Sequence, residues 1–108
     1  METIKSKRDI SDLFSGGKRV HTPYLTFIVL PKKQHGLNGR VAFIAGKKYG
    51  NAVWRNSAKR RLREVCRQVG GPWQEYDVVM LAKQNILTAS YWDVVNACRR
   101  ALEKSHLG

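Results

Sequence analysis

Basic side chains are concentrated in one stretch of this sequence, and the chemistry they can perform is phosphate binding. Between Lys47 and Arg63 there are seven lysines or arginines and no acidic residue. Guanidinium groups match phosphate oxygens with two parallel hydrogen bonds, and ammonium groups bind them as point charges. Most charge runs are simply solvated, but a helix kept soluble interleaves acids with its cations. The one-signed run therefore favours contact with a polyanion, and nucleic acid carries the densest regular charge.

Apolar residues recur among these cations at the spacing of an α-helix, which we expect from near Asn51 to Gln68. At about 100° per residue, one side collects Ala58, Leu62, Val65, Cys66 and Val69, and the opposite side collects Asn56, Lys59, Arg60, Arg63 and Arg67. Arg61 and Glu64 fall on the flanks. The pattern predicts a helix that packs through its apolar side and holds a row of cations toward solvent.

The segment before this helix offers a second candidate contact for phosphate. Gly46 and Gly50 permit a positive φ or a close backbone approach, and Asn51 is a candidate N-cap. Backbone N–H groups at a helix start can bind an anion, and Lys47 and Lys48 add positive charge nearby. A plain strand-to-helix turn explains the same residue types equally well.

Length and composition indicate a single folded domain with a strongly basic charge. Its 108 residues, 43% of them hydrophobic, fit one folded domain over 1–108. Twenty basic residues against eight acidic ones give a net charge of +12, which attracts polyanions. No apolar run approaches membrane-spanning length and no secretory core is visible, so we expect a cytoplasmic protein. Cys66 and Cys98 lack the spacing of a metal or redox motif and are expected to be buried thiols.

Other elements must position the basic helix. In chain order we expect a short helix with Ile10, Leu13 and Phe14 on one face, strands over 18–21, 24–31 and 40–45, the basic helix, a strand over 76–82, and a last helix that Ser90 caps. A turn-rich loop is predicted over 32–39. Along 24–31 the odd positions are uniformly apolar and the even ones mixed. The odd face is therefore expected on the core, and the even face toward a groove.

Residues 47–67 resemble the signature of the bacterial ribonuclease P protein component. That signature has a Lys-Lys pair, Gly-Asn-Ala-Val, an Arg-Asn-Arg box, Lys-Arg and a further Arg-Glu. The matching positions are Lys47, Lys48, Gly50, Asn51, Ala52, Val53, Arg55, Asn56, Lys59, Arg60, Arg63 and Glu64. The segment "DISDLFSGGKRV" looks like the family's opening helix and Gly-Lys-Arg turn. Two positions depart: Ser57 replaces the second arginine of the box, and Ile10 replaces the usual phenylalanine.

The resemblance implies a fold and a function. The fold is an α+β, two-layer sandwich in the order α-β-β-β-α-β-α, similar to ribosomal protein S5 domain 2, with a left-handed β-α-β crossover. The function is that of the protein subunit of ribonuclease P, which binds the catalytic RNA and the 5′ leader of precursor tRNA and assists endonucleolytic removal of the leader. The RNA performs the phosphodiester hydrolysis with Mg²⁺. The protein, expected as a monomer in a 1:1 complex with the RNA, is expected to bind no cofactor alone.

The resemblance also implies site residues, none of them catalytic and none a metal ligand. Contacts to the backbone of the RNA subunit fall to Arg55, Asn56, Lys59, Arg60, Arg63 and Arg67. The leader is expected in a groove lined by Ile10, Phe14, Thr26 and Ile28, with Lys18, Lys47 and Lys48 on its rim. An aromatic floor with a basic rim suits a single strand, since any base can stack. Core packing is the ordinary alternative for an apolar residue such as Phe14.

Two other interpretations compete with this one. A ribosomal protein or RNA chaperone would present the same basic surface without any role in cleavage. A protein-only nuclease would need paired carboxylates or a histidine set. In this sequence the close acidic pairs are Asp9 with Asp12 and Glu75 with Asp77, and both suit helix-cap or turn positions.

Overall fold

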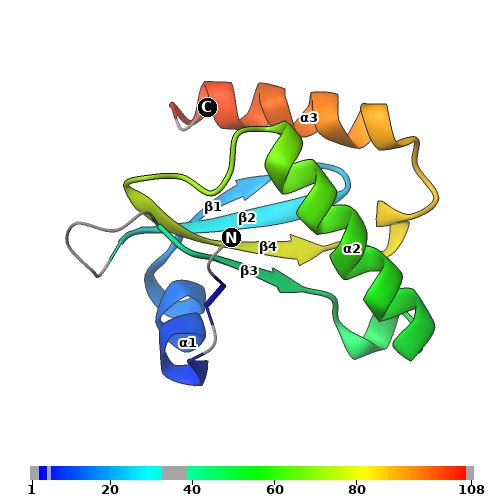
Figure 1. Ribbon diagram of the computed structural model, residues 1–108, viewed down its shortest axis with the longest axis horizontal. Coiled ribbons are helices and arrows are strands. Elements are labelled where there is room, and N and C mark those ends of the chain that lie inside the picture. Colours follow the sequence, from blue (N-terminus) through cyan, green and yellow to red (C-terminus); the bar gives the residue numbers. More distant parts are fainter. Residues whose placement is uncertain (1–2, 5, 33–38, 107–108) are drawn as a thin grey trace.

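The computed structural model describes residues 3–4, 6–32 and 39–106. Its elements are α1 (Lys7–Gly16), β1 (Lys18–His21), β2 (Leu25–Pro31), β3 (Val41–Ile44), the 3₁₀ turn η1 (Lys47–Tyr49), α2 (Ala52–Gln68), β4 (Tyr76–Ala82), the 3₁₀ turn η2 (Gln84–Ile86) and α3 (Tyr91–Lys104). This is the expected order of helices and strands (Figure 1). Residues 33–38 of the predicted loop lie outside the described residues.

In the described part of the chain, four strands form one mixed sheet in the order β1-β2-β4-β3. β2 pairs antiparallel with β1 and with β4, and β4 pairs parallel with β3. Since α2 joins β3 to β4, these three elements form the expected β-α-β crossover. Its left-handed sense stays a prediction from the family resemblance.

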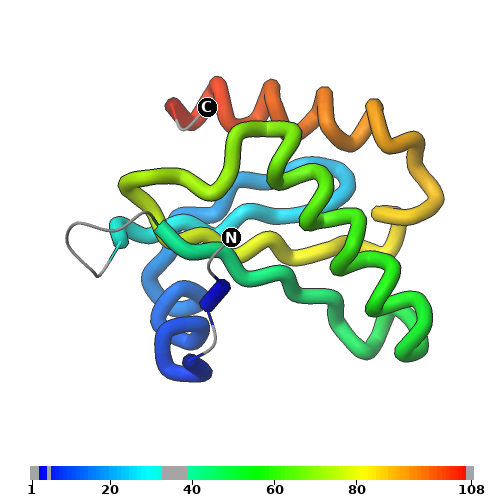
Figure 2. Tube along the Cα trace, viewed as in Figure 1, coloured from blue at the N-terminus to red at the C-terminus, as the bar shows by residue number. Residues whose placement is uncertain are grey.

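The two faces of the sheet are covered by different helices. Leu25, Phe27 and Val29 on the odd face of β2 pack in the main core with the apolar sides of α2 and α3, as predicted. Ile28 on the even face packs instead with Leu13 of α1 in a smaller cluster. Figure 2 shows α1 on the side of the sheet opposite α2 and α3. α2 and α3 thus form the helical layer of the sandwich, and α1 adds a partial cover on the other face.

Local side-chain chemistry sets where the helices begin. Asn51 caps α2, because its Oδ1 accepts a hydrogen bond from the Trp54 backbone N–H at 3.0 Å. Ser90 caps α3 in the same way through the Asp93 N–H at 3.4 Å. Both caps match the sequence prediction, and each stabilises its helix by about 1 kcal/mol.

A partly buried ion network ties α1 to the sheet. The guanidinium of Arg40 donates to Asp77 Oδ2 at 2.9 Å and to Asp9 Oδ2 at 3.3 Å. The hydrogen bond to Asp77 raises the pKa of Arg40 above its usual value. Asp9 and Asp77 thus have a structural role through Arg40, an ion-pair role that differs from the cap or turn role predicted for them.

Candidate nucleic-acid interface

The packed side of α2 fixes the direction of its cations. Ala58, Leu62, Val65 and Cys66 are fully buried against the sheet and α3. Burial raises the pKa of the Cys66 thiol to about 11, as expected for a dry apolar contact. A helix docked through this side has no freedom to rotate its opposite side inward.

The opposite side of α2 carries the predicted RNA-subunit contacts. Asn56, Arg60, Arg63 and Arg67 are exposed, and Arg55 and Lys59 are half-buried. In the part of the chain that the structure describes, none of the five cations in this set forms an ion pair with an acidic side chain. The predicted outward row is confirmed, whereas its contact with RNA stays a prediction.

Arg63 is held in place by an aromatic ring of the sheet. Its Cζ lies 5.6 Å from the centroid of the Phe43 ring on β3. A cation–π contact at an exposed site contributes roughly 0.5–1 kcal/mol. This contact ties the Arg63 side chain to β3, while the residue as a whole stays exposed.

Arg61 does not belong to the outward row. Its Nη1 donates to the backbone carbonyls of Ala89 at 2.9 Å and Ile86 at 3.3 Å. These bonds tie α2 to the connection between η2 and α3. The Nη1 of Arg61 is therefore committed to structural hydrogen bonds, although the positive charge of the side chain remains near Ser57.

The glycines before α2 were expected to permit either a positive φ or a close approach. Gly46 has φ −69° and Gly50 has φ 173°, so neither is left-handed. Close approach does apply at Gly50, where an added Cβ would lie 2.7 Å from the Trp54 side chain. Lys47 and Lys48 are exposed on η1, with Lys48 Nζ 4.9 Å from the centroid of the Tyr49 ring.

The predicted leader groove is only partly as expected. Ile28 is fully buried beneath α1, so its predicted place in an open lining is wrong. Ile10 and Phe14 of α1 are half-buried, which leaves part of each side chain accessible. Phe14 also packs under Arg19, whose Cζ lies 5.7 Å from its ring centroid. Phe14 thus packs against the sheet and against Arg19 while it stays partly exposed.

The register of the sheet shows which residues take the place of Ile28. One row across all four described strands joins His21, Thr26, Leu81 and Ile44. His21 is exposed, and Leu81 and Ile44 are half-buried. Thr26 is buried, with its Oγ1 3.2 Å from His21 Nδ1, so its predicted place in an open lining is wrong as well. The row of Ile28 lies one step closer to α1 and is covered. Sequence reasoning missed the three accessible members of this row, because they come from separate strands.

The predicted rim lysines lie at two places around this face. Lys18 is exposed at the start of β1, next to the end of α1. Lys47 and Lys48 follow the carboxyl end of β3. In Figure 1, α1 and the η1 segment both lie below the sheet, toward opposite ends of its strands. The lysines thus flank the half-covered face from both ends, as a basic rim requires.

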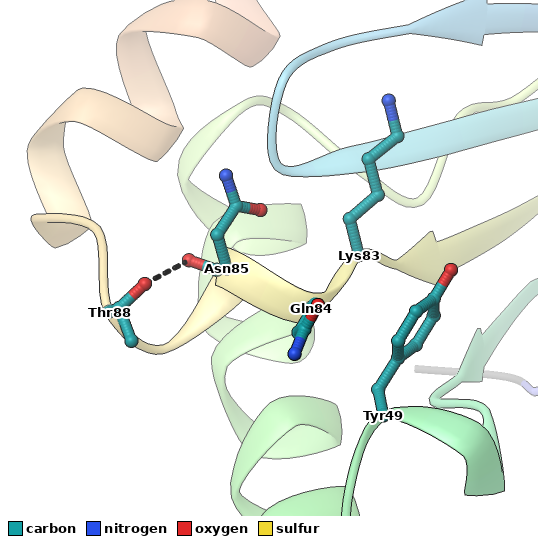
Figure 3. A pocket seen from close by; sticks show the side chains of 5 residues that line it. All are labelled: Tyr49, Lys83, Gln84, Asn85 and Thr88. Carbon is teal, nitrogen blue, oxygen red and sulfur yellow. Dashed lines mark hydrogen bonds between the residues drawn. The ribbon is translucent and has the colours of Figure 1, made fainter.

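A separate pocket opens at the carboxyl ends of the parallel strands β3 and β4. It has a volume of about 560 Å³ and is lined by Tyr49, Lys83, Gln84, Asn85 and Thr88 (Figure 3). Lys83 Nζ donates to the Thr22 carbonyl, and Thr88 Oγ1 donates to the Asn85 carbonyl at 3.3 Å. Nothing in the sequence pattern indicated this pocket. Its lining offers hydrogen bonds and one aromatic ring, but no carboxylate or imidazole for acid–base chemistry.

The described residues contain no candidate metal centre. No group of three or more His, Cys, Asp or Glu side chains among them is placed to hold an ion. Asp9 and Asp77 both form ion pairs with Arg40, which accounts for these two carboxylates without a metal ion. Within the same ranges, no helix has both the length and the apolar character to cross a bilayer.

Comparisons with known proteins agree with this geometry. The family model described as Ribonuclease P matches residues 1–106. The ribonuclease P protein component of Citrifermentans bemidjiense is 46% identical over 83 residues, which cover 77% of this chain and 70% of the relative. That of Streptococcus agalactiae serotype III is 34% identical over 102 residues, covering 94% of this chain and 84% of the relative.

Solved structures show the same fold. The RNase P protein of Staphylococcus aureus superimposes with a TM-score of 0.80 at 21% identity, covering 99% of this chain and 97% of that one. The RNase P protein of Thermotoga maritima gives a TM-score of 0.77 at 22% identity, covering 96% and 97%. At this identity the structures support the fold alone, and the family rests on the sequence matches. On those matches, the chain belongs to the ribonuclease P protein family.

Proposed function

We propose that this chain is the protein subunit of a bacterial ribonuclease P. In that complex it binds ribonuclease P RNA and the 5′ leader of precursor tRNA, and it assists endonucleolytic removal of the leader in the cytoplasm. The single observation that carries the proposal is the row of cations on α2, held outward by a buried apolar side and left without acidic partners in the described residues.

The α2 row suits the backbone of a folded RNA. Its cations are fixed on a rigid helix, so their spacing can match successive phosphates, whose positions carry no sequence information. Each phosphate neutralised releases counterions, which makes the affinity fall steeply with salt. Recognition of this kind selects the shape of an RNA rather than its base sequence.

The face between α1 and η1 suits a single strand. Phe14, Leu81 and Ile44 offer half-buried apolar surface, and Lys18, Lys47 and Lys48 supply charge near its ends. Stacking on an aromatic ring tolerates every base, which a leader of variable sequence requires. The leader is therefore assigned to this face and the RNA subunit to α2.

Bond cleavage is assigned to the RNA subunit, in a 1:1 complex with one copy of this chain. The described residues do not fit a magnesium site, since no cluster of ligands is present among them. The protein contributes by binding substrate and by adding positive charge beside the RNA, while Mg²⁺ belongs to the assembled complex.

Reconstitution with the host's own ribonuclease P RNA tests this function. At a low Mg²⁺ concentration the protein is expected to stimulate cleavage of precursor tRNA by that RNA, and to cleave nothing alone. Tight binding without stimulation would instead favour a pure RNA-binding module. Cleavage by the protein alone would support a protein-only nuclease.

A further inference from the structure

A small hollow lies on the flank of α2, beside the row of cations. It is lined by Ser57, Arg60, Arg61, Glu64 and Leu87, and its volume is about 170 Å³. Pockets for whole small molecules measure roughly 300–1,000 Å³. This hollow is therefore sized for one part of a larger ligand that the surrounding surface holds.

Three residues in the lining are suited to a phosphate group. The Ser57 hydroxyl and the exposed guanidinium of Arg60 are both hydrogen-bond donors. Arg61 adds a second positive charge that cannot move away, because its Nη1 is bonded to the carbonyls of Ile86 and Ala89. Charge-assisted bonds from such donors to phosphate are among the stronger ones available to a protein.

The lining of the hollow also includes the single acid of α2, Glu64. Glu64 lies three or four residues from Arg60, Arg61 and Arg67, yet in the described part of the chain it forms no ion pair with any of them. Its backbone carbonyl accepts a hydrogen bond from the Tyr91 hydroxyl at 3.4 Å, which ties this turn of α2 to α3. An ionised carboxylate is an acceptor only, so its partner in a ligand must be a donor.

We infer that this hollow is a subsite for one ribose-phosphate unit of the RNA subunit. Ser57 and Arg60 bind the phosphate, and Glu64 accepts a hydrogen bond from a ribose 2′-hydroxyl. The inference rests on the proposed function, since it places the RNA subunit on α2. RNA helices display phosphates and 2′-hydroxyls on their accessible surface, and the 2′-hydroxyl is the group that distinguishes RNA from DNA. Glu64 therefore gives a phosphate-binding surface a means of selecting RNA.

Analogue interference tests the subsite without relying on overall affinity. Ribonuclease P RNA is transcribed with 2′-deoxy phosphorothioate nucleotides at random positions, selected for protein binding, and cleaved with iodine to locate the substitutions that weaken binding. For the wild-type protein we expect interference of about two- to tenfold at one or a few riboses, the range of one hydrogen bond. Glu64→Ala should abolish it at those riboses. Glu64→Gln, whose carbonyl is still an acceptor, should retain it.

Affinity for unmodified RNA is a poor readout here, because removing Glu64 also removes a negative charge beside the phosphates. Glu103→Ala, which changes an exposed acid on α3, is the matched control and should keep the wild-type pattern. Identical patterns for wild type and Glu64→Ala would overturn the subsite. A second library can carry base analogues that lack an amino group. If wild type and Glu64→Ala differ only in that library, Glu64 binds a base rather than a ribose, and the subsite is overturned as well. A wild-type protein that binds no RNA in this selection contradicts the proposed function itself.

Discussion

The exposed side of α2 and the face between α1 and η1 are both assigned to RNA, yet they are built in different ways. The α2 surface comes from one continuous helix, whose orientation is fixed by Leu62 and its buried neighbours. The other face is assembled from four strands, α1 and η1, and its accessible row depends on strand register. A rigid row of charge suits the fixed phosphates of a folded RNA. A composite, half-apolar surface suits a strand of variable sequence.

The largest expected effect comes from undocking α2. Leu62→Ala removes a fully buried side chain from the packed side of the helix. Substitutions of this kind cost about 2–5 kcal/mol, so we expect about 3 kcal/mol less stability in urea unfolding. A loss below about 0.5 kcal/mol would mean that α2 is not held by this contact, and the outward row would lose its fixed direction.

Charge reversal in the outward row of α2 should weaken RNA binding more than the same change elsewhere on the surface. Arg60→Glu is expected to weaken binding of ribonuclease P RNA by about 2 kcal/mol, or about thirtyfold, the scale of a hydrogen bond to a charged group. Arg100→Glu on α3 is the matched control, because Arg100 is exposed and outside both assigned surfaces. Arg99 serves less well, since its Nη2 donates to the Gln68 carbonyl at 3.2 Å. Equal losses from the two reversals would show that charge acts diffusely.

Leader binding by the composite face should depend on the side chain of Phe14 and not on that of Ile28. Phe14→Ala is expected to weaken binding of precursor tRNA with a long leader by about 1.5 kcal/mol, or about tenfold, the scale of one stacked base. Substrates with a one-nucleotide leader should be affected little. Ile28→Val is the buried control and should lower stability by about 1 kcal/mol without changing leader dependence. A Phe14→Ala defect that is independent of leader length would point to folding rather than stacking.

The smallest effect concerns Cys66, which reports whether the packed side of α2 is dry. Burial raises its pKa from 9.0 to about 11. A raised folded pKa means that the thiol favours folding below pH 9 and that this contribution is lost as pH rises through 11. Between pH 8 and pH 10 we expect the wild type to lose about 1.3 kcal/mol more stability than Cys66→Ala. Parallel pH profiles for the two proteins would show that the thiol is solvated.

Features within one element could be predicted from the sequence, and features between elements could not. The N-cap at Asn51 and the two sides of α2 follow from spacing along a single helix. Ile28 was placed correctly on the even face of β2 but wrongly in an open groove, because the sequence does not show which part of that face α1 covers. The direction of Arg61 depends on carbonyls of Ile86 and Ala89, 25 and 28 residues away along the chain.

The salt dependence of RNA binding tests most directly whether the outward row of cations on α2 binds the RNA subunit. The slope of log Kd against log salt concentration counts the phosphates that the protein neutralises. For Arg60→Ala combined with Arg63→Ala we expect this slope to fall by about 2, or about 1 for each lost contact. Arg100→Ala combined with Lys104→Ala on α3 should leave the slope unchanged. If both double variants lower it equally, the docked helix has no special place in RNA binding and the account is contradicted.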